Sequence, residues 1–176
     1  MQRGFSLIEI LVALFVIVML ASLVTLNLSS PERDRMAEEA ADTVASLLDY
    51  ALEEAQYSGY EYGVFLSASE QADLTAKLTF KRFERSGWVS LSDSILTGPI
   101  EIADGVSLEL WVEGERIDLV PMPQDVANWR PSIRLWPSGE MTAGRAVISD
   151  TSEASLQSWE VDWTLFGGAT VTPVDR

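Results

Sequence analysis

A single carboxylate interrupts an otherwise uncharged N-terminal stretch: Glu9 is the only ionisable side chain between Phe5 and Pro31. A charged side chain at the centre of a bilayer costs roughly 2.5 to 3.5 kcal/mol on insertion scales, and less near the interface. Glu9 therefore either lies at the level of lipid headgroups or receives a cation brought by another group. The second interpretation would make it an ion-pairing site in apolar surroundings.

Most residue types that enzymes use are missing. The chain contains neither cysteine nor histidine, which excludes disulfides, thiolate nucleophiles, histidine general bases and the usual ligands of zinc and iron–sulfur clusters. Paired carboxylates could still hydrolyse a glycosidic bond, but chance pairs are expected among 27 acidic residues. There is no clustered Asp-x-Asp spacing of a calcium loop. We therefore expect no enzyme activity, no cofactor and no metal.

The charge balance argues against nucleic acid as a partner. Twelve basic residues face 27 acidic ones, for a net charge of −15, and such a surface repels phosphate backbones. The one basic cluster consists of Lys77, Lys81, Arg82 and Arg85. We interpret it as intramolecular salt bridges rather than as a DNA contact.

The apolar run that holds Glu9 is long enough to span a bilayer. Phe5 to Leu26 would form a helix of roughly 33 Å at about 1.5 Å per residue. A cleaved signal peptide would need a shorter apolar stretch and a small-x-small site, for which Ala21-Ser22 and Ser29-Ser30 are weak candidates. Arg3 before the run indicates a cytoplasmic N-terminus with the remainder translocated.

A second, amphipathic helix is predicted over Met36–Tyr57. Ser29 to Glu32 has the pattern of a helix start or a kink, with proline in the first turn, and Ser58-Gly59 is a stop signal. Its acidic face is expected to be solvated, with contact to a neighbouring subunit as the alternative. The apolar residues at helical spacing are Ala37, Ala40, Ala41, Val44, Leu48, Ala51, Leu52 and Ala55.

Beyond Gly59 the apolar period changes to two, which predicts strands. No helix-length spacer separates them, so we expect an antiparallel arrangement. Gly167-Gly168 predicts a hairpin turn, with further turns at Asp104-Gly105 and Glu113-Gly114. The expected strands are Tyr62–Leu66, Leu78–Phe83, Trp88–Leu91, Val106–Val112, Arg116–Val120, Ile133–Trp136, Arg145–Ile148, Trp159–Phe166 and Thr170–Val174.

Two stretches are expected to be loops, 121–131 and 149–158. Trp129 stands alone in the first of them, among three prolines. It could be an exposed contact residue, but we expect it to pack back onto the sheet. The other tryptophans are interpreted as core and cross-strand packing residues.

The run from Arg3 to Leu14 resembles the N-terminal motif of type IV prepilins and type II secretion pseudopilins. The resemblance implies that a prepilin peptidase cleaves between Gly4 and Phe5 and methylates the new amino group of Phe5. Glu9 would then be the fifth residue of the mature chain, where the family has its membrane glutamate. The amine of a neighbouring chain would supply its cation, which would set the axial register between subunits.

Two later segments, 53–64 and 133–140, resemble the H-type minor pseudopilins and the related FimT-like minor pilins. This implies a pseudopilus subunit for protein export across the outer membrane, near the filament tip. The implied partners are the major and minor pseudopilins, the prepilin peptidase and the inner-membrane secretion platform. A minor pilin of a type IV pilus, acting in pilus assembly, adhesion or DNA uptake, is the alternative.

The expected fold class is α+β, with a long N-terminal helix packed on an antiparallel β-rich head. The expected layout is a leader (1–4), a transmembrane and assembly helix (5–30), an amphipathic helix (31–59) and a periplasmic β domain (60–176). The protein would be a single-pass protein of the bacterial inner membrane, with its N-terminus in the cytoplasm.

Overall fold

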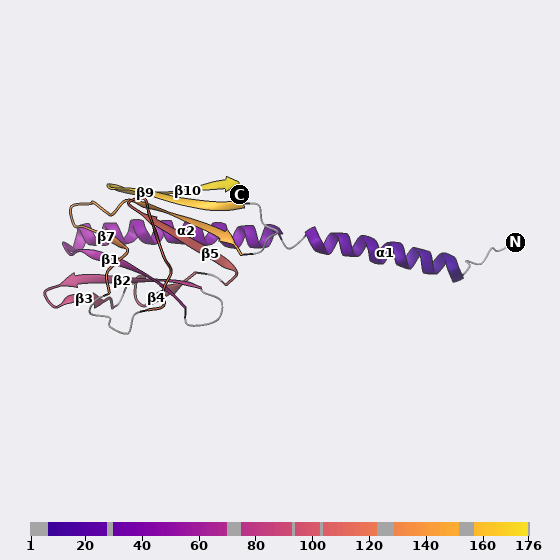
Figure 1. The fold of residues 1–176 in the computed structure, drawn as a ribbon, viewed down its shortest axis with the longest axis horizontal. Helices are drawn as coiled ribbons and strands as arrows, with labels where there is room; N and C mark the ends of the chain where they lie inside the picture. Colours follow the sequence, from indigo (N-terminus) through magenta and orange to yellow (C-terminus); the bar gives the residue numbers. More distant parts are fainter. Residues whose placement is uncertain are drawn as a thin grey trace.

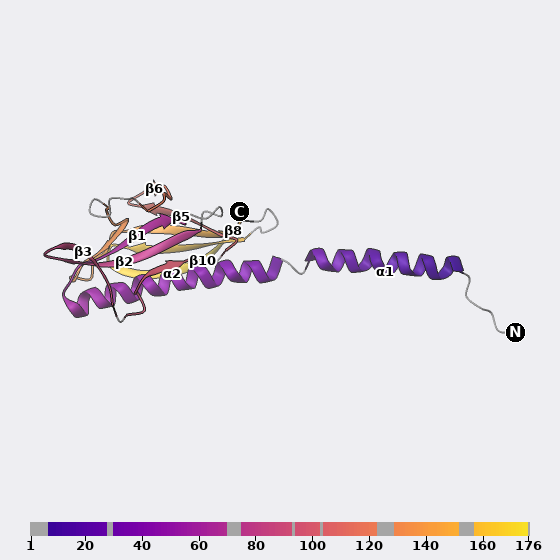
Figure 2. The ribbon, with the colours of Figure 1, turned by 90° about the horizontal axis from the view of Figure 1, so that it is seen from below.

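The computed structural model describes residues 7–27, 30–69, 75–92, 94–102, 104–122, 129–151 and 157–175. Two helices come first, α1 (Leu7–Asn27) and α2 (Ser30–Ser58), followed by strands only. Helix α1 extends away from the rest of the molecule, whereas α2 lies along the β-sheets (Figures 1 and 2). The α+β class and the order of helix before sheet are as expected.

Helix α2 is longer than the helix predicted over 36–57. It begins at Ser30 and carries Pro31 in its first turn, where proline is tolerated because its missing N–H would have no helical partner. It ends at Ser58, and Gly59 follows with a φ of +73°. The Gly59 amide donates to the Ala55 carbonyl at 3.0 Å, which is a common way of closing a helix with a left-handed glycine.

The strands form two sheets in which all pairs between named strands are antiparallel. In the first sheet the order is β3-β2-β1-β7, and β4 also pairs with β2. In the second the order is β10-β9-β8-β5-β6. The first sheet contains β1 (Tyr62–Ala68), β2 (Ala76–Glu84), β3 (Gly87–Ser90), β4 (Pro99–Glu101) and β7 (Ile133–Leu135). The second contains β5 (Val106–Val112), β6 (Glu115–Ile117), β8 (Gly144–Asp150), β9 (Gln157–Thr164) and β10 (Gly167–Asp175).

The apolar stripe of α2 forms one side of the hydrophobic core. All eight of its predicted apolar residues are buried. The helix packs mainly against β8, β9 and β10, and also touches β1 and β7. Leu48 of the helix lines one small interior gap together with Val64 and Leu78 of the first sheet and Leu108 of the second. One helix face therefore holds both sheets together.

The strand predictions are correct in type and mostly in extent, with three corrections. Strand β4 was not predicted because it is short and begins with Pro99, a position where proline is compatible with an edge strand. The strand predicted over 116–120 ends at Ile117, because the Val120 carbonyl accepts from the Ala68 amide of the other sheet at 2.8 Å. The segment after β6 thus leaves the second sheet and crosses to the first.

The third correction concerns the last hairpin. Its turn is formed by Leu165 and Phe166, which the prediction placed in the strand, and Gly167 opens β10 with a φ of +76°. A left-handed glycine directly after a two-residue turn keeps the twist of the flanking strands. The pairing then shifts register between Gly167 and Thr170.

Trp129 packs back onto the first sheet, as predicted. Its ring centroid lies 4.8 Å from that of Phe65 in β1. Trp88 lies against the same phenylalanine at 5.4 Å, edge to face. A Cβ atom on Gly63 would come within 2.8 Å of Trp88 and of Pro131. Only a glycine lets the loop and β3 approach β1 this closely.

We predict that Leu48→Ala destabilises the head by about 2 to 5 kcal/mol, the range for a buried leucine truncated in a packed core. Leu165→Ala is the matched control, because Leu165 is half exposed in the hairpin turn. Its effect should stay within about 0.5 kcal/mol. Urea unfolding followed by tryptophan fluorescence measures both, since all six tryptophans follow α2. Equal losses in the two variants would contradict the assigned core.

Candidate functional site

Helix α1 exposes apolar side chains on all sides. Leu7 is 82% exposed and Phe15 is 65% exposed, and the side chains described between them are exposed as well, as are those up to Met19. A surface this apolar calls for neighbouring apolar groups outside the chain. In the described part of the chain, no helix is long and apolar enough to cross a membrane.

The predicted processing site lies outside the described residues, because Gly4 and Phe5 precede Leu7. Glu9 belongs to the first turn of α1. Cleavage after Gly4, methylation of Phe5 and pairing of Glu9 therefore stay predictions.

The acidic face of α2 is exposed at Glu38, Glu39, Asp42 and Glu53. Asp49 differs, because its carboxylate accepts a hydrogen bond from the Ala169 amide of β10 at 3.1 Å. The face therefore combines solvated carboxylates with one that fastens the helix to the C-terminal strand. Solvation is the arrangement expected from the sequence for this face, and contact of the exposed carboxylates with a neighbouring subunit stays the alternative to be tested.

The two segments that carry the resemblance to H-type pseudopilins, 53–64 and 133–140, lie side by side. Strand β1 pairs with β7 through Tyr62 and Leu135, and Arg134 donates to Glu61 at 2.5 Å. The turn after β7 places Gly139 against the side chain of Gln56 in α2. This corner therefore joins the end of α2, the first strand and the Pro-x-Gly turn.

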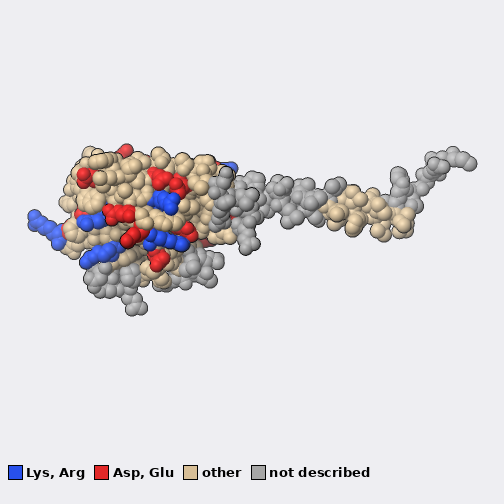
Figure 3. Space-filling model, turned by 45° about the horizontal axis from the view of Figure 1, so that its top comes forward, with Lys and Arg blue, Asp and Glu red and all other residues tan. Residues whose placement is uncertain are grey.

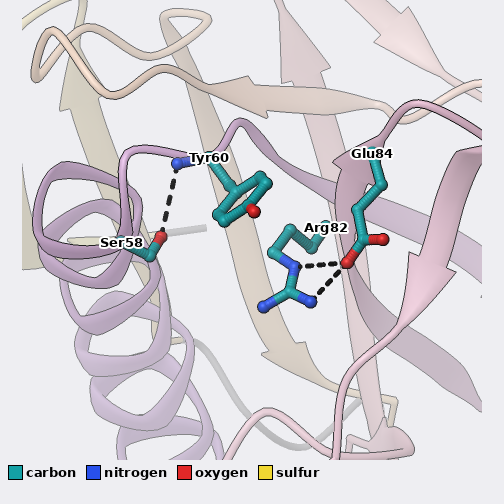
Figure 4. A network of polar contacts seen from close by, with 4 residues as sticks. All are labelled: Ser58, Tyr60, Arg82 and Glu84. Carbon is teal, nitrogen blue, oxygen red and sulfur yellow. Dashed lines mark hydrogen bonds and ion pairs between the residues drawn. The ribbon is translucent and has the colours of Figure 1, made fainter.

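Two members of the basic cluster form the predicted intramolecular ion pairs. Lys77 lies 2.7 Å from Glu101 of β4. Arg82 pairs with Glu84 and also covers the ring of Tyr60, with its Cζ atom 4.7 Å from the centroid (Figure 4). On the face shown in Figure 3, basic and acidic side chains alternate rather than forming a basic patch. This arrangement does not favour a DNA contact.

Lys81 departs from the prediction. It is only 8% exposed, and the described residues give it no carboxylate partner. Its Nζ atom lies 5.1 Å from the centre of the Phe65 ring and 5.3 Å from that of Trp129. Burial lowers the pKa of the Lys81 ammonium group. Sequence reasoning missed this site because Trp129 reaches it from a loop far along the chain.

A pocket of about 720 Å³ lies beside this lysine. It is on the face of the first sheet opposite to the one that packs into the hydrophobic core with α2. Ser67 and Thr79 line it, together with Met122 and Trp129 from the loop after β6. The pocket has apolar walls and a cation, a combination typical of small-ligand sites.

On the outer face of the second sheet, charged side chains surround Trp111. The guanidinium groups of Arg145 and Arg116 lie 4.7 and 5.9 Å from its ring centre. Arg145 pairs with Glu160 at 3.1 Å. Burial, reinforced by a hydrogen bond and the negative charge of Asp162, raises the pKa of Glu160, whereas Arg145 opposes the shift.

No group of three or more histidine, cysteine or acidic residues that could hold a metal ion occurs in the described ranges.

Comparison with known proteins gives matches at both the N-terminus and the level of the fold. Residues 1–25 match the family model described as the prokaryotic N-terminal methylation motif. Two solved structures of the minor pseudopilin EpsH, from the type 2 secretion system of Vibrio cholerae, match this chain with TM-scores of 0.62 and 0.57, both at 21% sequence identity. Each match covers 79% of this chain, and 97% and 96% of the respective EpsH chains. No curated protein matches the sequence.

The chain has a prepilin-like N-terminus and a minor-pseudopilin fold. The pseudopilin-like head therefore confirms the resemblance drawn from the sequence motifs.

For this pseudopilin-like head we predict that Glu160→Gln changes the pH dependence of stability. A raised carboxyl pKa means that the folded state holds the proton more tightly than the unfolded state. The contribution of Glu160 to stability therefore falls as pH rises from about 4.3, the unfolded value, through the folded pKa. The stability of the variant relative to wild type should increase from pH 4 to pH 7.

Urea unfolding at several pH values measures this difference. Glu109→Gln is the control, because it also removes one negative charge and one arginine pair, that with Arg116 at 2.9 Å. If Glu160→Gln instead loses stability toward pH 7, the pair with Arg145 outweighs the burial of Glu160.

Proposed function

We propose that the chain is a minor pseudopilin, a structural subunit of a type II secretion pseudopilus that supports protein export across the outer membrane. The likeness of its fold to EpsH over 79% of the chain carries this proposal. The methylation motif in residues 1–25 supports it as a separate observation, since it is a match of sequence rather than of fold. The proposed place of the subunit is near the filament tip.

The proposed layout assigns residues 1–4 to a leader, 5–30 to a membrane and assembly helix, 31–59 to the amphipathic helix and 60–176 to a periplasmic head. The prepilin peptidase would remove Met1 to Gly4 and methylate Phe5. The exposed apolar surface of α1 would first contact lipid of the inner membrane and then the equivalent helices of other pseudopilins. The inner-membrane secretion platform is the proposed partner during assembly.

A free amine at Phe5 and the carboxylate of Glu9 would compensate one another across subunits. Each group alone is unfavourable in an apolar environment, and pairing offsets part of that penalty. The pair would fix how far one α1 slides along its neighbour. It would thereby set the axial register of the subunit in the filament.

We predict that the exposed acidic face of α2 contacts other pseudopilins in the filament. A photo-crosslinking amino acid at Asp42 or Glu53 should capture major or minor pseudopilins in cells that assemble the secretion system, identified by mass. The same amino acid at exposed Glu115, in the hairpin β5–β6, is a control for random collisions. Capture of a type IV pilus shaft subunit instead would replace the secretion assignment with the pilus alternative.

The second prediction of this proposal concerns Glu9. Glu9→Ala should leave membrane insertion intact, because it removes a charged group from the apolar run. Assembly should fail, because leaving one member of a buried ion pair alone costs about 3 to 5 kcal/mol. That corresponds to a loss of assembly on the order of 10²- to 10³-fold. Copurification with the other pseudopilins, and secretion in a deletion strain, measure the effect.

Two controls make the result specific to the charge. Glu9→Gln, which keeps hydrogen-bonding capacity, should fall between wild type and alanine, and Leu11→Ala, which removes apolar surface but no charge, should lose less assembly than Glu9→Ala. The N-terminus of each variant is determined by mass, so that loss of cleavage after Gly4 is not mistaken for loss of pairing. Normal complementation by processed Glu9→Ala would leave Glu9 as a headgroup-level carboxylate.

A further inference from the structure

The chain contains only two lysines, Lys77 and Lys81, and both line the same pocket. The two residues lie four positions apart on the same face of β2, where Lys77 is opposite Ser67 of β1 and Lys81 is opposite Gly63. Their surroundings, however, give them different roles.

Lys77 has its counter-charge within the fold, because Glu101 lies 2.7 Å away. Lys81 is more deeply buried, and in the described part of the chain its ammonium group contacts only the rings of Phe65 and Trp129. Aromatic faces attract a cation but do not neutralise it. Burying a charged ammonium group costs free energy, and a bound anion would offset part of that cost.

The residues that line the pocket indicate which kind of molecule would carry that anion. Met122, Pro99 and the ring of Trp129 offer apolar contact, and the hydroxyl groups of Ser67 and Thr79 can donate hydrogen bonds to an anionic oxygen. The pocket, at about 720 Å³, has the size of sites that enclose small ligands or several side chains. A single buried cation matches a single negative charge. The acidic surface of the chain disfavours polyanions.

We propose that this pocket binds a carboxylate carried on an apolar body, with Lys81 as its charge partner and Trp129 as its apolar wall. The carboxylate belongs either to a free organic acid or to an acidic side chain beside apolar residues of another protein. The inference concerns the head alone and does not depend on the proposed assembly role.

The state of Lys81 gives a direct measure of binding. Because burial lowers the pKa of Lys81 in the free protein, an incoming carboxylate must raise it. Selective labelling of lysine in the full-length chain, in detergent micelles, yields only two side-chain NMR signals to follow. Titration with 3-phenylpropionate should shift the Lys81 signal to saturation and raise its pKa, with a much smaller change at Lys77.

Ligands of the same shape test the role of charge. 3-Phenylpropanol, which lacks the carboxylate, should bind at least about 10-fold more weakly, as expected when a charge-assisted hydrogen bond is lost. 3-Phenylpropylamine should not shift the Lys81 signal. Equal binding of the alcohol and the acid would overturn the assignment of a carboxylate site.

Variants test the role of Lys81 by equilibrium dialysis with the same acid. Lys81→Met, which keeps the length and apolar stem, should retain the fold and lose binding by about 10-fold or more. Arg116→Met is the matched control, because it removes one positive charge from the head at a residue that does not line the pocket, and its affinity should stay within about 3-fold of wild type. Folding is checked by urea unfolding, in which Lys81→Met should be no less stable than wild type. Wild-type affinity in Lys81→Met would overturn the proposal.

A peptide distinguishes the two sources of the carboxylate. If acetyl-Leu-Glu-Phe-amide shifts the Lys81 signal as the free acid does, the site accepts an acidic side chain of a protein partner. If only the free acid does so, the site takes a small organic acid. If neither does, the pocket is not a carboxylate site and the two aromatic rings alone hold the lysine.

Discussion

The burial of one face of α2 against both sheets is the interaction on which the head depends. The face is made largely of alanines, with Val44, Leu47, Leu48 and Leu52 as the larger members. Small side chains let the helix approach the strands closely, and the few large ones fill the space between the sheets. Since each sheet alone would leave an apolar face in water, neither is expected to be stable without this helix.

The same chain presents two surfaces suited to different surroundings. Helix α1 exposes apolar side chains at every described position up to Met19 except the first-turn site of Glu9, whose side chain lies outside the description. The head, in contrast, exposes ion pairs and carboxylates, with the arginines distributed among the acids (Figure 3). This distribution of apolar and charged surface suits a chain whose helix α1 lies among apolar neighbours while its head lies in water.

Local pattern was enough to predict the elements, and contacts between distant segments explain where it failed. The alternation over Val106–Val112 matches β5 residue for residue, because one face of that strand is buried and the other is half exposed. The short β4 and the early end of β6 depend on pairing with other strands, which no local period encodes. The interpretation of Lys81 as a salt-bridged residue failed for the same kind of reason. Its neighbours Phe65 and Trp129 come from β1 and from a loop after β6, and only the fold brings them together. The processing site was predicted from a motif rather than from packing, and its chemistry is to be tested by experiment.

The alignment of α1 with α2 has a mechanical consequence. The two helices follow one another along the long axis of the molecule (Figure 2). A tensile force on α1 would thus be transmitted along α2. The side chains of α2 pack against β8, β9 and β10, and Asp49 accepts a hydrogen bond from the last strand. Such a load acts in shear, so that many contacts must yield together instead of one after another. The head is thereby built to resist axial tension without a covalent crosslink.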